Sequence, residues 1–223
     1  MIRKKTIPHI LYTFAACQTR NSMEIKDFIN NIYPLPETSI QKLLSHTSKQ
    51  SRPKGSRLIE AGSIESHIFF VTQGIVRAYI SVDGRKITFW IGAEGSTVVS
   101  LRSYVDNMPG YETVECMEDC VVYMLERSVL ETLFLQDIHI ANWGRKFAET
   151  EFLQTEERFI PLLFTTASER YEELLKKQPH LFSRISLEHL ASYLGITPVS
   201  LSRIRANLSK NRSPQNGSTP SLP

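Results

Sequence analysis

The chain has 223 residues, enough for one large or two small domains. Its apolar fraction of 41% and charged fraction of 22% are ordinary for a globular protein, and a formal charge of +3 is too small to indicate nucleic-acid binding by itself. No apolar stretch reaches the ~20 residues that span a bilayer, which argues against a membrane protein, and three cysteines without a CxxC motif fit a reducing cytoplasm.

The first 22 residues form a leader of uncertain status. Basic residues at positions 3–5 precede a modest apolar run that ends at Cys17, which faintly resembles a secretory or lipoprotein signal. Pro8 and His9 interrupt this run. A start codon assigned too early, with Met23 as the real start, explains the segment more simply, so we expect residues 1–22 to be disordered or outside the native chain.

Residues 23–49 are predicted to be helical, with a break at Pro34 and Pro36. Apolar residues fall at helical spacing on both sides of the break: Ile25, Phe28, Ile29, Ile32, Ile40, Leu43 and Leu44.

From residue 55 the pattern changes to short apolar strands between glycines, and seven of the ten glycines lie between Gly55 and Gly110. Residues 76–82 and 87–91 alternate in polarity around Asp83–Gly84, a strong hairpin signal. Further strands are predicted at 68–71, 113–116 and 121–125. Short strands with glycine turns favour an antiparallel roll resembling a double-stranded jelly roll, and the flanking helices make the fold class α+β.

Two helices are predicted after the sheet, a short one from Ser128 to Leu135 and a longer one from about Ile138 to Phe159. The longer helix has an apolar stripe, continued less regularly toward its end: Ile140, Trp143, Phe147, Phe152, Leu153, Phe159 and Ile160. Such a helix either packs only on its own β-roll or pairs with a second copy, and the charges between Glu149 and Arg158 dilute any seam.

Pro161 is expected to end or kink this helix. Thr166 and Glu169 match a capping box, so a new helix is predicted there, ending before Pro179. Residues 161–168 are therefore a candidate hinge between the N-terminal and C-terminal parts of the chain.

Residues 185–208 carry the clearest functional pattern, two short helices joined by a tight turn. Ser186 and the pair Thr197–Pro198 mark the two starts, and Gly195 marks the exit of the first helix. The apolar positions lie on one face of each helix: Leu187, Leu190, Ala191, Leu194, Leu201, Ile204 and Leu208. Arg203 and small polar side chains on the other faces suit the DNA major groove, although an ordinary αα-hairpin is the alternative.

Positive charge is locally in excess around this segment. From residue 184 to residue 212 only Glu188 opposes five basic residues, Arg184, Arg203, Arg205, Lys210 and Arg212. Such an excess suits phosphate contacts, and a solvated basic end is the alternative.

The run ASYLGITPVSLSRIR resembles the helix-turn-helix of the Crp-Fnr transcription regulators, in a form found in Bacteroidetes. The glycines of Lys54–Gly55, Ala61–Gly62 and Gln73–Gly74 resemble those of the cyclic nucleotide-binding β-roll. The resemblance implies a sensor domain (23–136), a dimerisation helix and hinge (137–165), a helix-turn-helix domain (166–208) and a disordered tail (209–223). It also implies a cytoplasmic homodimer without enzymatic activity that binds double-stranded DNA and has RNA polymerase as a further partner.

The resemblance assigns candidate residues to DNA and to the dimer. Arg203 matches the family's arginine and is expected to contact a base, Ser200 and Ser202 to contact bases or phosphates, and Thr197, Arg205 and Lys210 to contact phosphate. Val199 replaces the family's glutamate, which implies a different base preference, and no wing hairpin follows Leu208. The dimer contacts implied are Ile140, Trp143 and Phe147.

The effector site is where the resemblance weakens. The family holds a phosphate with a short helix begun by Gly-Glu-Leu and with an Arg-Ser or Arg-Thr pair. Here Gly95–Ser96–Thr97 and Tyr111–Glu112–Thr113 align with these elements, so both the glutamate and the arginine are missing. A cyclic nucleotide is therefore not expected, and the effector is unknown. The candidate pocket residues are Trp90, Ser96, Thr97, Arg102 and Tyr104.

No cofactor or metal is predicted, because three cysteines are too few for the usual cluster ligation and no histidine and cysteine have ligand spacing. Two rival functions stay open. A cupin-type metalloenzyme also has a glycine-rich roll but needs clustered His and Glu ligands. A cyclic-nucleotide-like module could regulate a protein partner without binding DNA.

Overall fold

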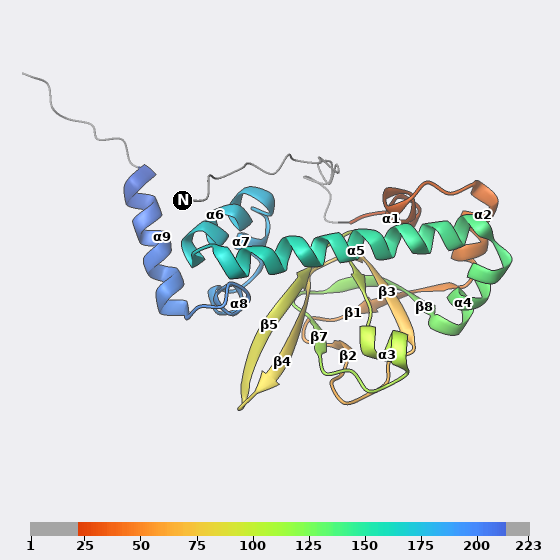
Figure 1. The fold of residues 1–223 in the computed structure, drawn as a ribbon, viewed down its shortest axis with the longest axis horizontal. Helices are drawn as coiled ribbons and strands as arrows, with labels where there is room; N and C mark the ends of the chain where they lie inside the picture. The colour runs from red at the N-terminus through yellow and green to blue at the C-terminus, as the bar shows by residue number, and fades with distance from the viewer. Residues whose placement is uncertain (1–21, 213–223) are drawn as a thin grey trace, which may run out of the picture.

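The protein is an antiparallel β-roll flanked by helices, with further helices at its C-terminal end (Figure 1). The computed structural model describes residues 22–212. The predicted α+β class is confirmed. Cys17, residues 1–21 of the expected leader and residues 213–223 of the expected tail lie outside the described residues.

The two N-terminal helices form where predicted, α1 at Ile25–Ile32 and α2 at Glu37–Leu44. The helical prediction to residue 49 is wrong at its end, because strand β1 occupies Thr47–Arg52. This strand is polar and lacks apolar alternation. It forms because its whole length pairs antiparallel with strand β8 (Cys120–Glu126), whose residues lie 68 to 78 positions away along the chain, a contact that no local pattern encodes.

The β-roll consists of two four-stranded antiparallel sheets, in the orders β1-β8-β3-β6 and β2-β7-β4-β5. The remaining strands are β2 (Arg57–Ile59), β3 (His67–Gln73), β4 (Val76–Val82), β5 (Arg85–Gly92), β6 (Thr97–Val98) and β7 (Thr113–Cys116). Asp83 and Gly84 both have positive φ, 50° and 75°, as the predicted tight hairpin between β4 and β5 requires. Apolar side chains fill the space between the sheets.

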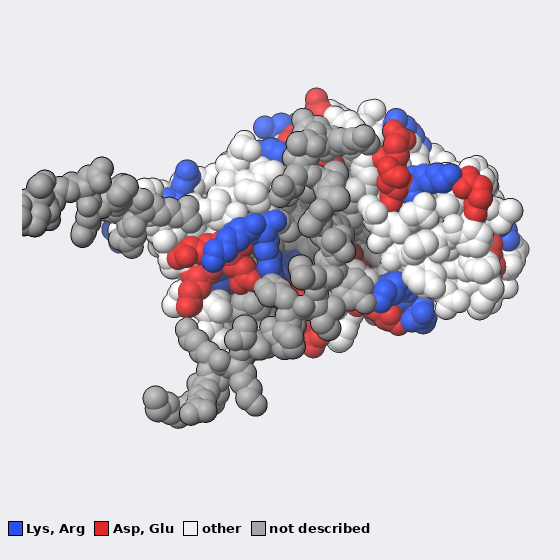
Figure 2. Space-filling view, turned by 90° about the horizontal axis from the view of Figure 1, so that it is seen from above, with Lys and Arg blue, Asp and Glu red and all other residues white. Residues whose placement is uncertain are grey.

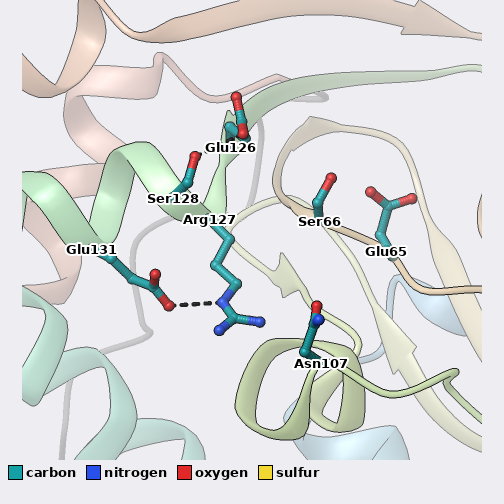
Figure 3. Close-up of a pocket in the computed structure, with 7 residues that line it drawn as sticks. All are labelled: Glu65, Ser66, Asn107, Glu126, Arg127, Ser128 and Glu131. Carbon is teal, nitrogen blue, oxygen red and sulfur yellow. Dashed lines mark hydrogen bonds and ion pairs between the residues drawn. The ribbon is translucent and has the colours of Figure 1, made fainter.

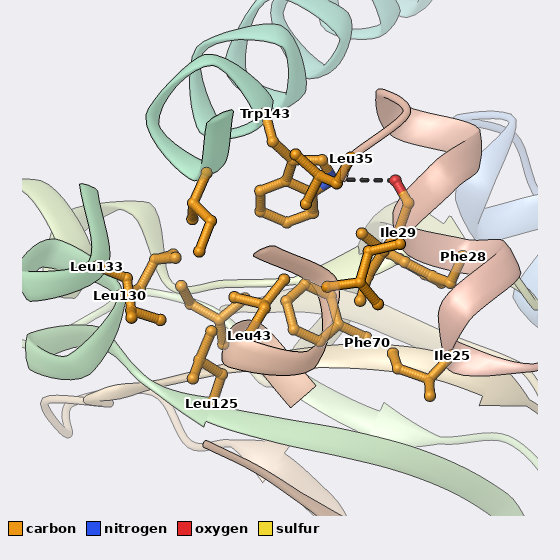
Figure 4. Packing of buried hydrophobic residues seen from close by; sticks show 13 residues of the cluster. Ile25, Phe28, Ile29, Leu35, Leu43, Phe70, Leu125, Leu130, Leu133 and Trp143 are labelled. Carbon is orange, nitrogen blue, oxygen red and sulfur yellow. Dashed lines mark hydrogen bonds between the residues drawn. The ribbon is translucent and has the colours of Figure 1, made fainter. Parts of the chain in front are cut away.

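Helix α5 (Ile138–Phe164) crosses the roll from α2 and α4 to the C-terminal helices (Figure 1). Its N-terminal half packs into a second core between the first sheet and the helices (Figure 4). Trp143 is 1% exposed, and its indole N–H donates a hydrogen bond to the carbonyl of Ile29 (2.9 Å). Helix α4 (Arg127–Gln136) begins one residue before the predicted Ser128.

Pro161 lies inside α5, so the prediction that it ends the helix is wrong. The helix continues for three more residues because Thr165 donates its backbone N–H to the Pro161 carbonyl (2.9 Å), which closes the last turn. The predicted hinge is thus helical in its first half, and the extended residues Thr165 and Thr166 form the break.

Four helices follow, α6 (Ala167–Lys177), α7 (Leu181–Arg184), α8 (Leu187–Tyr193) and α9 (Pro198–Arg212). The capping box of α6 is confirmed, since Thr166 and Glu169 satisfy each other's backbone N–H groups. The predicted disordered tail is corrected at its start, because residues 209–212 continue α9. In Figure 1, α9 stands at the end of the molecule, away from the β-roll.

Candidate nucleic-acid interface and effector site

Helices α8 and α9 form the predicted two-helix motif, with each terminal signal in its expected role. The Ser186 hydroxyl accepts a hydrogen bond from the backbone N–H of His189 (3.3 Å). Gly195 has φ +71°, the left-handed conformation that reverses the chain after α8. The Thr197 hydroxyl accepts from the backbone N–H of Ser200 (3.1 Å), which satisfies a free amide in the first turn of α9.

One face of α9 is anchored and the other is open. Leu201 is fully buried, and Ile204 and Leu208 pack against the same apolar cluster. Val199 and Arg203 lie four residues apart on the opposite face, where Val199 is 61% exposed and Arg203 is exposed. The motif therefore presents one helix face to solvent with its backbone held from behind.

The other candidate DNA residues fall around this open face. Ser202 and Arg205 are exposed, and no ion pair engages Arg203 or Arg205 among the described residues. Thr197 is exposed, but its hydroxyl lies 2.9 Å from that of the half-buried Ser200. The two hydroxyls therefore hydrogen-bond to each other at the start of α9. The side chain of Lys210 lies outside the described part of the chain.

Arg184 does not belong to this basic surface, which corrects its place in the predicted local excess. Its guanidinium donates to both carboxylate oxygens of Glu94 (3.0 and 2.6 Å) and also binds Glu118. Burial acts to raise the pKa of Glu94, but hydrogen bonds from Arg184 and from the backbone hold that pKa below its usual range. We call Arg184 with these two carboxylates the Arg184 clamp. It fastens α7 to the β-roll.

A second contact fixes α8 to the free edge of the second sheet. The Ser192 hydroxyl accepts from the backbone N–H of Thr88 (2.9 Å) and donates to the carbonyl of Lys86 (3.3 Å). Strand β5 is the edge of its sheet, so this hydroxyl satisfies backbone groups that would otherwise be unpaired. Sequence patterns gave no signal for this contact or for the Arg184 clamp, because both join residues about 65 to 105 positions apart.

One face of the molecule carries charge of both signs. On the face shown in Figure 2, acidic and basic side chains lie beside one another.

The short helix of the predicted effector site, α3 (Leu101–Asp106), starts later than expected. It begins after Ser100, whereas Gly95 and Ser96 form a turn and Thr97 lies in β6. The assignment of Gly95–Ser96–Thr97 to the helix start is therefore wrong. Residues 97–100, which include strand β6, separate this turn from the helix.

Near the start of α3, the Glu112 carboxylate and the Ser100 hydroxyl lie close to the same glycine, Gly110. The Glu112 side chain is 5% exposed, and its carboxylate accepts a hydrogen bond from the backbone N–H of Tyr111 (3.1 Å). The hydroxyl of Ser100 is buried without a hydrogen-bond partner. A Cβ atom built on Gly110 would lie 2.5 Å from this hydroxyl and 3.2 Å from the carboxylate, so the two groups face the same backbone segment.

The five predicted pocket residues differ in their surroundings. Ser96 accepts a hydrogen bond from the backbone N–H of Ala93 (3.1 Å), Thr97 is buried, and Trp90 packs between the sheets. Arg102 is exposed on the outer side of α3, while Tyr104 faces the helical core with Arg127 over its ring. A shared effector pocket of these five residues stays a prediction.

Two shallow hollows lie elsewhere. One, of about 340 Å³, is lined by Glu65, Ser66, Asn107, Glu126, Arg127, Ser128 and Glu131, and an Arg127–Glu131 ion pair crosses it (Figure 3). The other, of about 540 Å³, lies between the β4–β5 hairpin and α8. In residues 22–212, no three His, Cys, Asp or Glu side chains are grouped as metal ligands, and no helix has the length and apolar character to cross a bilayer.

Residues 49–137 match the family model of the cyclic nucleotide-binding domain. The match starts in β1 and ends at the residue before α5, so it covers the β-roll and α4. A comparison with curated protein sequences finds no match.

Solved structures extend the likeness to the C-terminal helices. A protein from Eubacterium rectale described as a transcriptional regulator of the Crp/Fnr family has a TM-score of 0.64 and 17% identity, over 81% of this chain and 88% of that chain. FixK2 from Bradyrhizobium japonicum has a TM-score of 0.62 and 23% identity, over 77% of this chain and 89% of that chain. The c-di-GMP-responsive regulator of Xanthomonas campestris has a TM-score of 0.60 and 17% identity, over 79% of this chain and 93% of that chain. At these identities the comparison shows a shared fold.

The matched domain raises the question of whether a cyclic nucleotide fits the site. A cyclic phosphate needs N–H donors and a cation. At this position the structure offers the buried Glu112 carboxylate and the Ser100 hydroxyl, and no described cation forms an ion pair with Glu112. A second negative charge beside a buried carboxylate is unfavourable, so these residues do not fit a cyclic nucleotide.

Proposed function

We propose that this protein is a sequence-specific DNA-binding transcription regulator of the Crp-Fnr type. The observation that carries the proposal is the open face of α9, which presents Val199, Ser202 and Arg203 to solvent while Leu201 anchors it. Arginine reads guanine through two hydrogen bonds in the major groove. The shared fold with Crp/Fnr regulators supports the same function.

We further infer a homodimer, with a different surface from the one predicted. Ile140 and Trp143 are core residues of one chain and are not available as dimer contacts, while Phe147 is half-buried and stacks on Trp143. All but one of the large exposed apolar side chains of α5 lie in its C-terminal half: Phe152, Leu153, Phe159, Ile160, Leu162, Leu163 and Phe164. The exception is Ile138 at the other end of the helix. An apolar surface of this kind on one helix is typical of a protein–protein interface.

The domain boundaries follow from the same reasoning. We assign residues 23–136 to the sensor, 137–165 to the dimerisation helix and hinge, and 166–212 to the DNA-binding part. The effector, if one binds, is of another class than cyclic nucleotides. Two copies of α9 in the dimer would reach half-sites about one DNA turn, ~34 Å, apart.

The test starts from the full chain and a pool of genomic fragments, from which bound DNA is selected. Affinity for the selected site is then measured by gel shift at two salt concentrations, because phosphate contacts make affinity fall steeply with salt. Adding cyclic AMP is expected to leave the affinity unchanged.

Arg203→Ala is expected to weaken binding to the selected site by about 5- to 150-fold and to relax its sequence preference. Lys54→Ala, an exposed cation on the β-roll, is the matched control and should bind as the wild type does. Equal affinity of the Arg203 variant and the wild type would overturn the assignment of Arg203. Failure to select any DNA would favour the alternative, a module that regulates a protein partner.

A further inference from the structure

One arginine connects the ends of two helices close to the start of α9. Arg170, near the start of α6, donates hydrogen bonds from its guanidinium to the carbonyl of Thr165 (2.6 Å) and to the carbonyl of Leu194 (3.1 Å). Thr165 caps the C-terminal end of α5, and Leu194 caps the C-terminal end of α8. We call this contact the α5–α8 joint.

Both acceptors of the joint suit a cation. The last carbonyl groups of an α-helix have no partner within the helix, and the helix dipole places partial negative charge at that end. The guanidinium of Arg170 carries its N–H donors in one fixed plane, so it can bind two carbonyls at once, whereas a lysine ammonium is a point charge on a flexible stem. Arg170 therefore holds the two helix ends in one relative position.

The helices around the joint are packed together independently of these hydrogen bonds. Arg170 is half-buried, and its Nε atom is buried without a hydrogen-bond partner. The next residue, Tyr171, is buried and packs edge-on against Phe182, with 5.2 Å between the ring centroids. Tyr171 belongs to the same apolar cluster as Leu190 and Leu201. Loss of the Arg170 side chain is therefore expected to loosen the joint without unfolding α6 to α9.

A second contact joins α5 to the same end of α8. The guanidinium carbon of Arg158, in α5, lies 5.3 Å from the ring centroid of Tyr193, the last residue of α8. A guanidinium over an aromatic ring is attracted by the negative face of that ring. Two arginines thus hold the C-terminal end of α8 against the C-terminal part of α5.

The position of α9 follows from this end of α8. Only residues 195–197 separate Leu194 from Pro198, the first residue of α9. This short connection is itself fixed, because the N–H of Ile196 donates to the carbonyl of Ala191 (3.0 Å). A change in the angle between α5 and α8 is therefore passed on to α9.

We propose that Arg170 is a positioning residue that fixes the orientation of α9 relative to α5 and thereby sets the half-site spacing that the protein accepts. In a dimer joined through α5, this orientation determines how far apart the two copies of α9 lie. One added base pair moves a half-site by about 3.4 Å and turns it by about 35°, so a rigid joint accepts few spacings. This inference rests on the proposed function and on the proposed dimer.

The other contacts of these helices have a different role. The Arg184 clamp and the Ser192 hydroxyl hold α7 and α8 to the β-roll, and their partners lie outside α5. Because these contacts do not involve Arg170, they persist when it is replaced. We therefore expect α9 to gain freedom of orientation, rather than to be released, when Arg170 is removed.

The first test measures DNA affinity as a function of half-site spacing. Duplexes carry the two selected half-sites at the selected spacing, at spacings one and two base pairs longer or shorter, or one half-site alone. Arg170→Ala should weaken binding at the selected spacing by about tenfold, because a flexible joint lowers the effective concentration of the second α9 at its half-site. Binding at the other spacings should fall much less, and affinity for a single half-site should stay within about twofold.

Three further variants separate positioning from a general structural defect. Arg170→Lys should keep part of the spacing preference, since an ammonium can replace one of the two contacts. Arg158→Ala should flatten the preference in the same direction but less. Arg145→Ala is the matched control, because this exposed arginine of α5 pairs with Glu149 away from the joint and should leave the preference unchanged. An equal loss for Arg170→Ala on every duplex, the single half-site included, would overturn the proposal.

A second test needs no DNA and so separates this inference from the proposed function. Spin labels are placed at Ala148→Cys in α5 and Val199→Cys in α9, both exposed, in the full chain with Cys17→Ser, since the two remaining cysteines are buried. Dilution with unlabelled chain restricts the measurement to distances within one chain. Double electron–electron resonance should give a narrow distance distribution, and Arg170→Ala should broaden it.

The two tests fail in different ways. An unchanged width in the Arg170→Ala protein would overturn the proposal whether or not DNA is bound. A broadened distribution in a protein that selects no DNA would overturn the proposed function and support the role of Arg170 in placing α9.

Discussion

The two halves of α5 carry similar apolar side chains but use them in different ways. Near the N-terminal end Ile140 and Trp143 are buried in the core of their own chain. Near the C-terminal end Phe152, Phe159 and Leu163 are 69%, 57% and 58% exposed. A single helix therefore contributes to a core at one end and leaves an apolar surface open at the other.

Helical geometry explains how both surfaces fit on one helix. Sixteen positions separate Trp143 from Phe159, which at about 100° per residue places their side chains about 160° apart. One stripe faces the β-roll and α1, and the other faces away from them. The spacing of apolar residues thus predicts that a helix face packs against something. Which segment packs there depends on the rest of the fold.

The largest effect that sharpens this contrast is expected at Trp143. Trp143→Ala should lower the free energy of unfolding by about 3–5 kcal/mol, because it leaves a cavity and removes the hydrogen bond to Ile29. Urea denaturation measures this loss. Phe164→Ala, at a residue that is 80% exposed, is the control and should change the chain's own stability by less than about 0.5 kcal/mol. A comparable loss in both variants would remove the distinction between the two halves.

An intermediate effect is expected at the open stripe. Phe159→Ser should weaken self-association by about 2–4 kcal/mol, or roughly 30- to 1,000-fold, if Phe159 is a central interface residue. Sedimentation equilibrium measures the dimer constant. Ile138→Ser changes an apolar residue that is 69% exposed at the other end of the helix and should leave association unchanged. Equal dimerisation of both variants would move the interface away from this stripe.

The smallest effect concerns the cap of the buried half. The Asp137 carboxylate accepts hydrogen bonds from His139 (3.0 Å) and Ser39 (2.9 Å). Desolvation acts to raise its pKa, but the Ser39 hydroxyl and the backbone N–H groups of α5 hold the pKa below its usual value. A lowered folded-state pKa means that this stabilisation is present above the unfolded-state pKa and is lost as pH falls through the folded-state value.

Asp137→Ala should therefore lower stability by about 1 kcal/mol at pH 7, and the difference from the wild type should shrink below about pH 4 as the carboxyl is protonated. Unfolding curves at pH 7, 5 and 3, followed by tryptophan fluorescence, measure it. A difference that stays constant down to pH 3 would show that the charge of Asp137 does not act as the cap.

Local signals in the sequence predicted local structure well. The Asp83–Gly84 hairpin, the Thr166–Glu169 capping box and the Gly195 turn depend on backbone preferences and short-range hydrogen bonds, so a few neighbouring residues suffice to specify them. The inward and outward faces of α9 also follow from apolar spacing alone.

Sequence patterns gave wrong predictions where contacts with a distant segment determine the local structure. Strand β1 has no apolar pattern and forms through pairing with β8. Arg184 looked like part of a basic surface and is instead bound by Glu94 and Glu118 from two different turns. The start of α3 was misplaced because β6, which pairs with β3, lies between the Gly95–Ser96 turn and the helix.

By itself the sequence determined most of the helices, the β4–β5 hairpin, the α8–α9 turn and the exposed face of α9, because these features arise from neighbouring residues. The tertiary structure alone decided which apolar stripe of α5 is core and which is open, and that Glu112 lies buried beside Ser100. Burial and charge pairing depend on atoms from distant segments, and only folding brings those atoms together.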